Sequence, residues 1–147
     1  MSVDPIVAGT DGSSSAEAAV DKAAALARAL GAAVHVVSAY STDSSGAWMA
    51  ATGGMPVAVD DSEGARRAAT EIVARSRARL QGQGVEVRTH VCQGDPAEAL
   101  MTIAGDEHAQ MIVVGNRGMM GARRILGSVP NRVSHRARCG VLIVPTT

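Results

Sequence analysis

The stretch VVGNRGMMGARRILGS, residues 113–128, closes an apolar run and then places four glycines before regular structure resumes. The last glycine, Gly127, is followed directly by Ser128. Glycines let backbone N–H groups approach an anion closely, and the start of a helix offers further N–H groups. The same residues are also ordinary turn chemistry with a serine as helix cap. The segment therefore indicates either a surface connection or a cradle for an anion.

Two known phosphate-binding motifs do not match this segment. A Walker A loop needs a lysine directly before its final serine or threonine, whereas Gly127 precedes Ser128 and the one lysine of the chain is Lys22. The dinucleotide fingerprint opens with two glycines separated by one residue, whereas two residues separate Gly115 from Gly118. The segment follows neither motif, although its glycines still suit a phosphate.

Short apolar runs alternate with longer, alanine-rich amphipathic stretches along the chain. We expect strands at residues 3–10, 33–40, 85–91, 110–114 and 141–144. We expect helices at residues 13–30, 63–81, 95–104 and 129–138. Apolar strands joined by helical crossovers are typical of a parallel sheet covered on both faces. The sequence therefore predicts one α/β domain over residues 1–147, a doubly wound five-stranded parallel sheet of strand order 3-2-1-4-5 with helices on both faces.

This topology predicts where a ligand would bind. In doubly wound sheets, ligands bind beyond the carboxyl ends of the strands, where the winding reverses. If the first and fourth strands flank that point, the turn at 9–13 and the segment from Gly115 onward face one crevice. Asp11 in that turn suits a ribose diol, but it could also cap the following helix, as could Ser13 or Ser14. Two separate glycine clusters are thus expected to meet at one site.

The composition argues against several classes of protein. Fourteen basic and fourteen acidic residues cancel, which does not favour partners recognised by charge alone, such as nucleic acid or a membrane surface. No apolar run approaches the roughly 20 residues that span a bilayer, and no signal peptide is recognisable at the N-terminus. Cys92 and Cys139 form no CxxC pair. We interpret them as small buried side chains of a protein in a reducing compartment. We therefore expect a cytoplasmic protein with neither a nucleic-acid nor a membrane partner.

The spacing Gly115-x2-Gly118-x8-Gly127-Ser128, placed between an apolar strand and a helix, resembles the universal stress protein family. Nucleotide-binding members of that family carry a similar motif with one more residue between the second and third glycines, so the shortening here falls in residues 119–126. The resemblance covers essentially the whole chain. IVAGTDGSSSAEAAVDKA looks like the family's first strand, turn and helix, and VHVVSAY looks like its second strand. The most specific match is QMIVVGNRG together with LGSVPNRVSHRARCGVLIV.

The resemblance implies an ATP-binding regulatory domain, with magnesium as a companion of the ATP and with AMP or cyclic AMP as alternative ligands. Carried over by position, Asp11 would accept hydrogen bonds from the ribose hydroxyls. The residues expected to border the adenine are Gly9, Thr10 and Ala39. Those expected at the sugar and phosphates are Val114, Gly115, Gly118, Gly127, Ser128 and Val129. Arg117 would either pair with phosphate or belong to a solvated loop face.

Three classes of function remain open at this point. The first is an ATP-binding stress regulator. The second is a universal-stress-like module that binds no nucleotide and acts through dimer or partner contacts, which the shortened segment 119–126 favours. The third is an enzyme, such as a slow ATP hydrolase or an adenylating enzyme. The sequence disfavours the enzyme because no Walker-type lysine or paired catalytic side chains accompany the glycines.

The resemblance also implies a homodimer, and the last strand offers a way to form one. Its apolar residues are Val141, Leu142, Ile143 and Val144. A strand that ends a sheet leaves an edge exposed in a monomer. Pairing two such edges about a two-fold axis would bury both.

Three further residues have no role in the predicted site. His35 and His90 lie on expected strands without a second ligand at metal spacing, so we interpret them as structural or surface residues and expect no metal site. Trp48 lies alone in the long segment 41–62, where it would be either a lid over the nucleotide or an anchor for a partner.

Overall fold

The computed structural model describes residues 3–41, 62–116 and 127–145. In chain order, the elements are β1 (Ile6–Gly9), α1 (Ser14–Leu30), β2 (Val34–Tyr40), α3 (Ser62–Leu80), β3 (Val87–Gln93), α4 (Pro96–Asp106), β4 (Met111–Gly115), α5 (Ser128–Arg136) and β5 (Gly140–Val144). All neighbouring strands pair in parallel, in the order β3-β2-β1-β4-β5. The predicted α/β sheet and its strand order are therefore confirmed.

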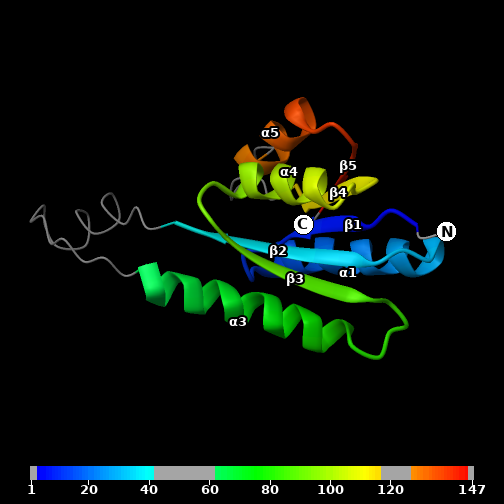
Figure 1. The fold of residues 1–147 in the computed structure, drawn as a ribbon, viewed down its shortest axis with the longest axis horizontal. Helices are drawn as coiled ribbons and strands as arrows, with labels where there is room; N and C mark the ends of the chain where they lie inside the picture. The colour runs from blue at the N-terminus through cyan, green and yellow to red at the C-terminus, as the bar shows by residue number, and fades with distance from the viewer. Residues whose placement is uncertain (1–2, 42–61, 117–126, 146–147) are drawn as a thin grey trace, which may run out of the picture.

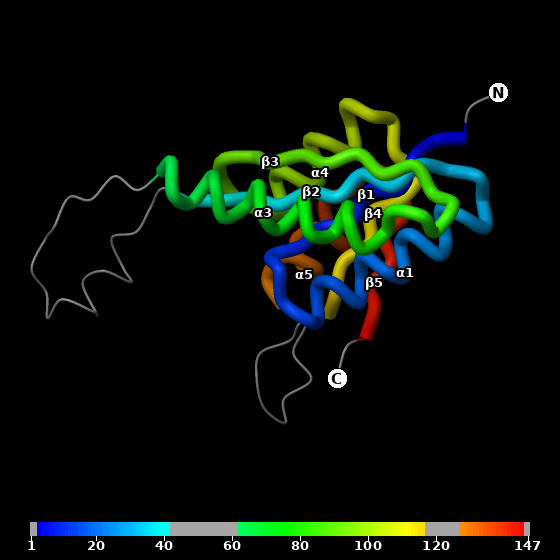
Figure 2. The backbone as a smooth tube through the Cα atoms, turned by 90° about the horizontal axis from the view of Figure 1, so that it is seen from below, coloured from blue at the N-terminus to red at the C-terminus, as the bar shows by residue number. Residues whose placement is uncertain are grey.

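Helices cover both faces of this sheet (Figure 1). Successive side chains of a strand point to opposite faces, and β1 shows the result. Ile6 and Ala8 pack into the apolar layer with α1 and α3, whereas Val7 packs into the layer with α4 and α5. Viewed from below, α3 lies along β2 and β3 (Figure 2). The core is thus divided into two apolar layers, one on each face of the sheet.

Small side chains let α1 lie close to the sheet. Ala19, Ala23 and Ala27 recur at helical spacing and are fully buried. At the start of the helix, Ser13 accepts a hydrogen bond from a backbone N–H of the first turn, as a serine N-cap does. At its end, Gly31 has a φ of 70°, a left-handed conformation that glycine adopts without strain. Helix α1 therefore follows the predicted range closely.

Most element boundaries differ from the prediction by one to three residues, and those of β1, β3 and α5 have a local cause. β1 begins at Ile6 rather than residue 3, because Pro5 has no N–H and the pairing with the next strand starts where Ile6 N–H donates to Ala33 O at 2.9 Å. β3 runs to Gln93 rather than 91, because it stays paired with β2 to the last residue of that strand. α5 begins at Ser128, one residue earlier than predicted, and ends at Arg136 because the residue after it is extended.

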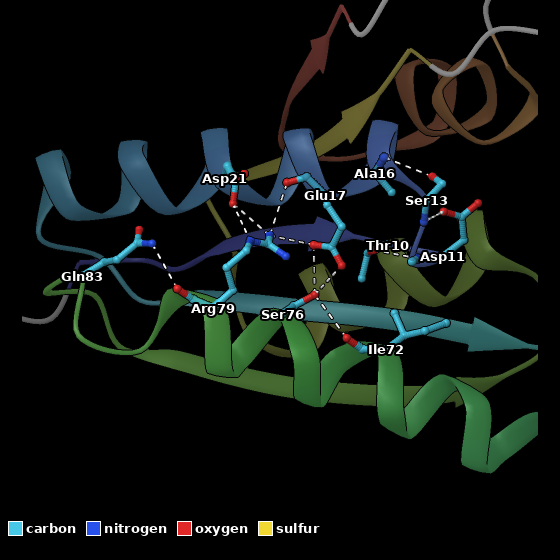
Figure 3. Close-up of polar contacts among 11 residues, drawn as sticks. Thr10, Asp11, Ser13, Ala16, Glu17, Asp21, Ile72, Ser76, Arg79 and Gln83 are labelled. Atoms are coloured by element: carbon cyan, nitrogen blue, oxygen red, sulfur yellow. Dashed lines mark hydrogen bonds and ion pairs between the residues drawn. The ribbon is translucent and has the colours of Figure 1, made fainter.

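A polar cluster fixes α3 against α1 (Figure 3). The fully buried hydroxyl of Ser76 donates to both carboxylate oxygens of Glu17, at 2.9 and 3.1 Å. Arg79 Nη2 lies 2.7 Å from Glu17 Oε2 and 2.9 Å from Asp21 Oδ1. Because the Glu17 carboxylate accepts hydrogen bonds from Ser76 and pairs with Arg79, it lies at the centre of the contact between α1 and α3.

Two expectations about membranes and cysteines can be compared with the described ranges. No helix within those ranges combines the length and apolarity needed to cross a bilayer. Cys92 and Cys139 are half-buried and form no disulfide. Burial raises the pKa of both thiols, which keeps them protonated near neutral pH.

Candidate functional site at the carboxyl ends of β1 and β4

A pocket of about 250 Å³ opens at the carboxyl ends of β1 and β4. Nine of the residues predicted for the ligand site line it: Gly9, Thr10, Asp11, Ala39, Val114, Gly115, Gly127, Ser128 and Val129. The other two, Arg117 and Gly118, lie outside the described residues. The winding reverses between β1 and β4, and at this reversal the structure brings the turn after β1 together with Gly115 and Gly127, which flank the undescribed residues 117–126.

The turn after β1 is fixed by its own side chains (Figure 3). Thr10 Oγ1 accepts from Gly12 N–H at 3.0 Å, and Asp11 Oδ1 accepts from Ser13 N–H at 2.9 Å. Gly12 has a φ of 85°, where a residue with a Cβ would be strained. Ser13 caps α1, with its Oγ accepting from Ala16 N–H at 3.2 Å. The open choice of helix cap is thus settled in favour of Ser13, and Asp11 shapes the turn from an exposed position on the pocket wall.

Two glycines at this site are needed for packing between elements. A Cβ on Gly115 would lie 3.2 Å from both the backbone oxygen and the Oγ of Ser15 in α1. A Cβ on Gly9 would lie 3.0 Å from both terminal methyl carbons of Leu100 in α4. The sequence interpretation assigned such glycines to close approach of an anion. The structure gives these two a second reason, since helices on both faces come close to the strand ends.

The first turns of three helices border the pocket. Ser15 and Ala16 come from α1, Pro96 from α4, and Ser128 and Val129 from α5. The start of a helix carries a partial positive charge and backbone N–H groups without partners inside the helix. Three such ends border one cavity, and each end that carries no acidic cap makes its environment favourable for an anion.

The N-terminal ends of α4 and α5 are capped differently. Asp95 accepts from Glu98 N–H at 3.0 Å and binds Arg132 Nη1 at 2.6 Å. The backbone hydrogen bond and then Arg132 lower the pKa of this carboxyl group, so a fixed negative charge already occupies the start of α4. At α5 the N-cap is Gly127, which has no side-chain cap. The alternative interpretation of Ser128 as the cap is therefore wrong, because Ser128 is the first helical residue.

Sequence reasoning missed the apolar wall of the pocket. That wall includes Val37, Leu100 and Pro130 beside the predicted Ala39 and Val114. The strand pattern could have suggested Val37, because it lies on the same face of β2 as Ala39. Leu100 faces Gly9 through the packing of α4 on the sheet, which no local pattern encodes. The pocket therefore combines an apolar wall with helix N-termini.

The structure brings the two strand histidines, His35 and His90, together. His35 Nδ1 and His90 Nε2 are 2.8 Å apart, and the rings stack with centroids 5.0 Å apart. Glu107 completes a group whose ligand atoms all lie within 4.8 Å of one another. The sequence shows no second ligand at metal spacing for either histidine, and the parallel register of β2 and β3 is what places the two side by side.

Comparison with known proteins agrees with the fold. Residues 2–145 match the model of the universal stress protein family. A universal stress protein of Mycobacterium tuberculosis is 39% identical over 97% of this chain and 96% of its own. A universal stress protein solved in complex with cAMP has a TM-score of 0.71 at 29% identity, over 98% of each chain. One from Archaeoglobus fulgidus in complex with dAMP has a TM-score of 0.71 at 25% identity, over 97% of this chain and 98% of its own. The chain therefore belongs to the universal stress protein family.

Proposed function

We propose that this protein binds an adenine nucleotide, with ATP as the expected ligand, in the pocket at the ends of β1 and β4, and that it acts as a stress-response regulator. The observation that carries the proposal is the pairing of an apolar wall with the starts of α1, α4 and α5 in one cavity. A base needs the first and a phosphate needs the second. The solved relatives in complex with cAMP and dAMP support the same ligand class.

The phosphates would lie against α5. Its N-cap, Gly127, offers no side chain to its first turn, whereas Asp95 already caps α4. Ser128 and Val129 carry backbone N–H groups at that position, and the exposed hydroxyl of Ser128 adds a further donor. Arg117 and Gly118 belong to the same proposal as additional phosphate contacts.

The nucleoside would lie on the other side of the pocket. Val37, Ala39 and Leu100 form a surface suited to the flat faces of adenine, next to the backbone of Gly9 and Thr10. Asp11 is the acidic side chain of this wall, and its carboxylate would accept hydrogen bonds from the ribose hydroxyls.

Regulation by binding is favoured over turnover. Among the described residues that line the pocket, Asp11 is the one ionisable side chain, so the described lining holds no second ionisable side chain for general acid and base chemistry. Nucleotide would then act by changing the population of a conformation that a partner recognises. Slow ATP hydrolysis, with magnesium, is the less favoured alternative.

A homodimer through β5 completes the proposal. β5 lies at the end of the sheet, next to β4 (Figure 1). Its residues Val141, Leu142 and Ile143 are half-buried and apolar. Antiparallel pairing with a second copy would cover this edge. Sedimentation of the protein at micromolar concentration should show a dimer, and a single monomeric species would contradict this part of the proposal.

Calorimetric titration with ATP, AMP, cyclic AMP and adenosine tests the nucleotide site. The sharpest variant is Ser128→Pro, because proline is tolerated at the first helical position while it removes one N–H and the hydroxyl. We expect this variant to weaken the binding of ATP at least about tenfold and to leave the affinity for adenosine unchanged. Ser134→Ala, an exposed change in the same helix, is the control.

The outcomes separate the candidate functions. Absence of heat with every nucleotide would overturn the nucleotide proposal and favour the module that acts only through dimer or partner contacts, for which the short segment 119–126 is the specific argument. Equal ATP binding by Ser128→Pro would overturn the placement of the phosphates at α5. Magnesium-dependent turnover that is lost in Asp11→Ala would favour the hydrolase.

A further inference from the structure

A second cluster of polar side chains lies on the sheet face covered by α4, away from the nucleotide pocket. His35 of β2 is buried, and His90 of β3 and Glu107, just past the end of α4, are half-buried. One ligand atom from each residue lies within 4.8 Å of the other two. None of the three lines the pocket at the ends of β1 and β4.

The parallel sheet holds the two imidazoles in place. His90 pairs with Val37, and His35 pairs with Arg88, so the two histidines are diagonal neighbours on one face. Their rings are nearly parallel, with an interplanar angle of 13°. Because both side chains arise from adjacent strands of one sheet, their positions are set by a rigid part of the fold. Preorganised ligands of this kind lose little conformational freedom when an ion binds.

The distances are close to those of a bound ion. His35 Nδ1 and His90 Nε2 are 2.8 Å apart and share a hydrogen bond. An ion with tetrahedral metal–nitrogen bonds of about 2.0–2.1 Å holds two nitrogens about 3.3 Å apart. Small side-chain rotations that widen the pair by about half an ångström would admit the ion. The ion would then take the place of the shared proton, with a lone pair from each ring directed at it.

The charges around the pair also suit a cation. The hydrogen bond between the two ring nitrogens needs one of them to accept, and a nitrogen that accepts carries the lone pair that a metal ligand must offer. The Glu107 carboxylate contributes negative charge to the cluster. Arg88, the nearby cation on β3, is paired with Glu86 at 3.0 Å.

We propose that His35, His90 and Glu107 bind one divalent transition-metal ion of the zinc class. Two imidazoles with one carboxylate form a donor set typical of zinc and its neighbours, whereas magnesium and calcium prefer oxygen ligands alone. A water molecule would fill the fourth position. The proposal is independent of the nucleotide site, because the two sites share no residue.

The test is a titration of the full-length protein with Zn²⁺ after treatment with a chelator and its removal. We expect saturation at one ion per chain with a dissociation constant on the order of micromolar or below. Titration with Co²⁺ should give visible bands of a tetrahedral or five-coordinate ion without a thiolate charge-transfer band. Cys92 lies on the same strand face as His90 but is not part of the three-residue cluster. We therefore expect Cys92→Ser to bind Co²⁺ and Zn²⁺ as the natural chain does.

Variants locate the ion. His90→Gln and Glu107→Gln change half-buried residues, and each should weaken the binding of Zn²⁺ at least about tenfold. His135→Gln, an exposed change in α5, should leave the affinity for Zn²⁺ unchanged. Far-ultraviolet circular dichroism verifies that each variant is folded. Absence of saturable binding by the natural chain, or undiminished binding by folded His90→Gln, would overturn the proposal.

Discussion

Gly9 and Leu100 meet so closely that a Cβ at position 9 would lie 3.0 Å from both terminal methyl carbons of the leucine. Leu100 is almost fully buried at 2% exposure, and both residues line the nucleotide pocket. The missing side chain of Gly9 thus sets how near α4 lies to the end of β1. The same contact forms part of the apolar wall of the pocket.

We expect Gly9→Ala to lower the free energy of unfolding by about 1 kcal/mol and to weaken nucleotide binding, because Leu100 must move to admit the methyl group. Urea unfolding and calorimetric titration measure the two effects. Gly105→Ala in α4 is the matched control, since a Cβ there meets nothing within 4 Å. That control should gain up to about 1 kcal/mol from lower chain entropy. A Gly9→Ala protein with natural stability and affinity would contradict the packing argument.

The cap of α1 gives a second prediction. Ser13→Ala should lower the free energy of unfolding by about 1 kcal/mol, because the Ala16 N–H loses its hydrogen-bond acceptor. Ser14→Ala should change it by no more than about 0.5 kcal/mol, because Ser14 is exposed and already inside the helix. Chemical denaturation of both variants makes the comparison. Similar losses in the two would place the cap elsewhere.

The contact between α1 and α3 gives a third prediction. Arg79→Met should lower the free energy of unfolding by about 1 kcal/mol, because a partly shielded guanidinium binds both Glu17 and Asp21. Arg88→Met should cost close to nothing, since Arg88 and Glu86 each have side chains 62% exposed. Thermal and urea unfolding of the two variants provide the measurement, and equal losses would show that the cluster adds no more than an ordinary surface pair.

The buried histidine gives a prediction about pH. Burial and then His90 lower the pKa of His35 below its ordinary 6.5, with Arg88 acting in the same direction and Glu107 and Glu86 opposing it. The unfolded chain therefore takes up this proton at a higher pH than the folded chain. Stability is complete above the unfolded pKa and falls as the pH drops from there toward the lower, folded pKa.

Urea unfolding of the metal-free protein between about pH 7.5 and about pH 5 measures this effect. His35→Asn should flatten the dependence in that range. If that variant does not fold, His90→Gln should reduce the slope, because His90 is the second cause that lowers the pKa of His35. His135→Gln should retain the natural profile, because its side chain is exposed. A natural chain whose stability rises on acidification would contradict the assignment.

Much of the fold could be predicted because its signals are local. Apolar strands such as Met111–Gly115 and the alanine repeat of α1 indicate their own structure, and the alternation of strands and helices then limits the topology. The position of the pocket followed from that topology, since the turn after β1 and the end of β4 flank the reversal of winding.

What could not be predicted depends on contacts between distant segments. His35 and His90 are 55 residues apart, and a shift of one residue in the register of β2 and β3 would send His90 to the opposite face. The approach of Leu100 to Gly9 likewise depends on how α4 packs on the sheet. The choice of Ser13 over Ser14 as helix cap depended on backbone angles that the residue type leaves open.

Helix α4 extends between the two proposed sites. Pro96 and Leu100 line the pocket near its start, and Glu107 follows its last residue. Its 11 residues make a rod of about 16 Å. If both ligands bind and either one displaces this rod, thermodynamic reciprocity requires nucleotide to change the affinity for metal by the same factor as metal changes the affinity for nucleotide. Titrations of the two ligands, each in the presence of the other, would then give one shared coupling constant.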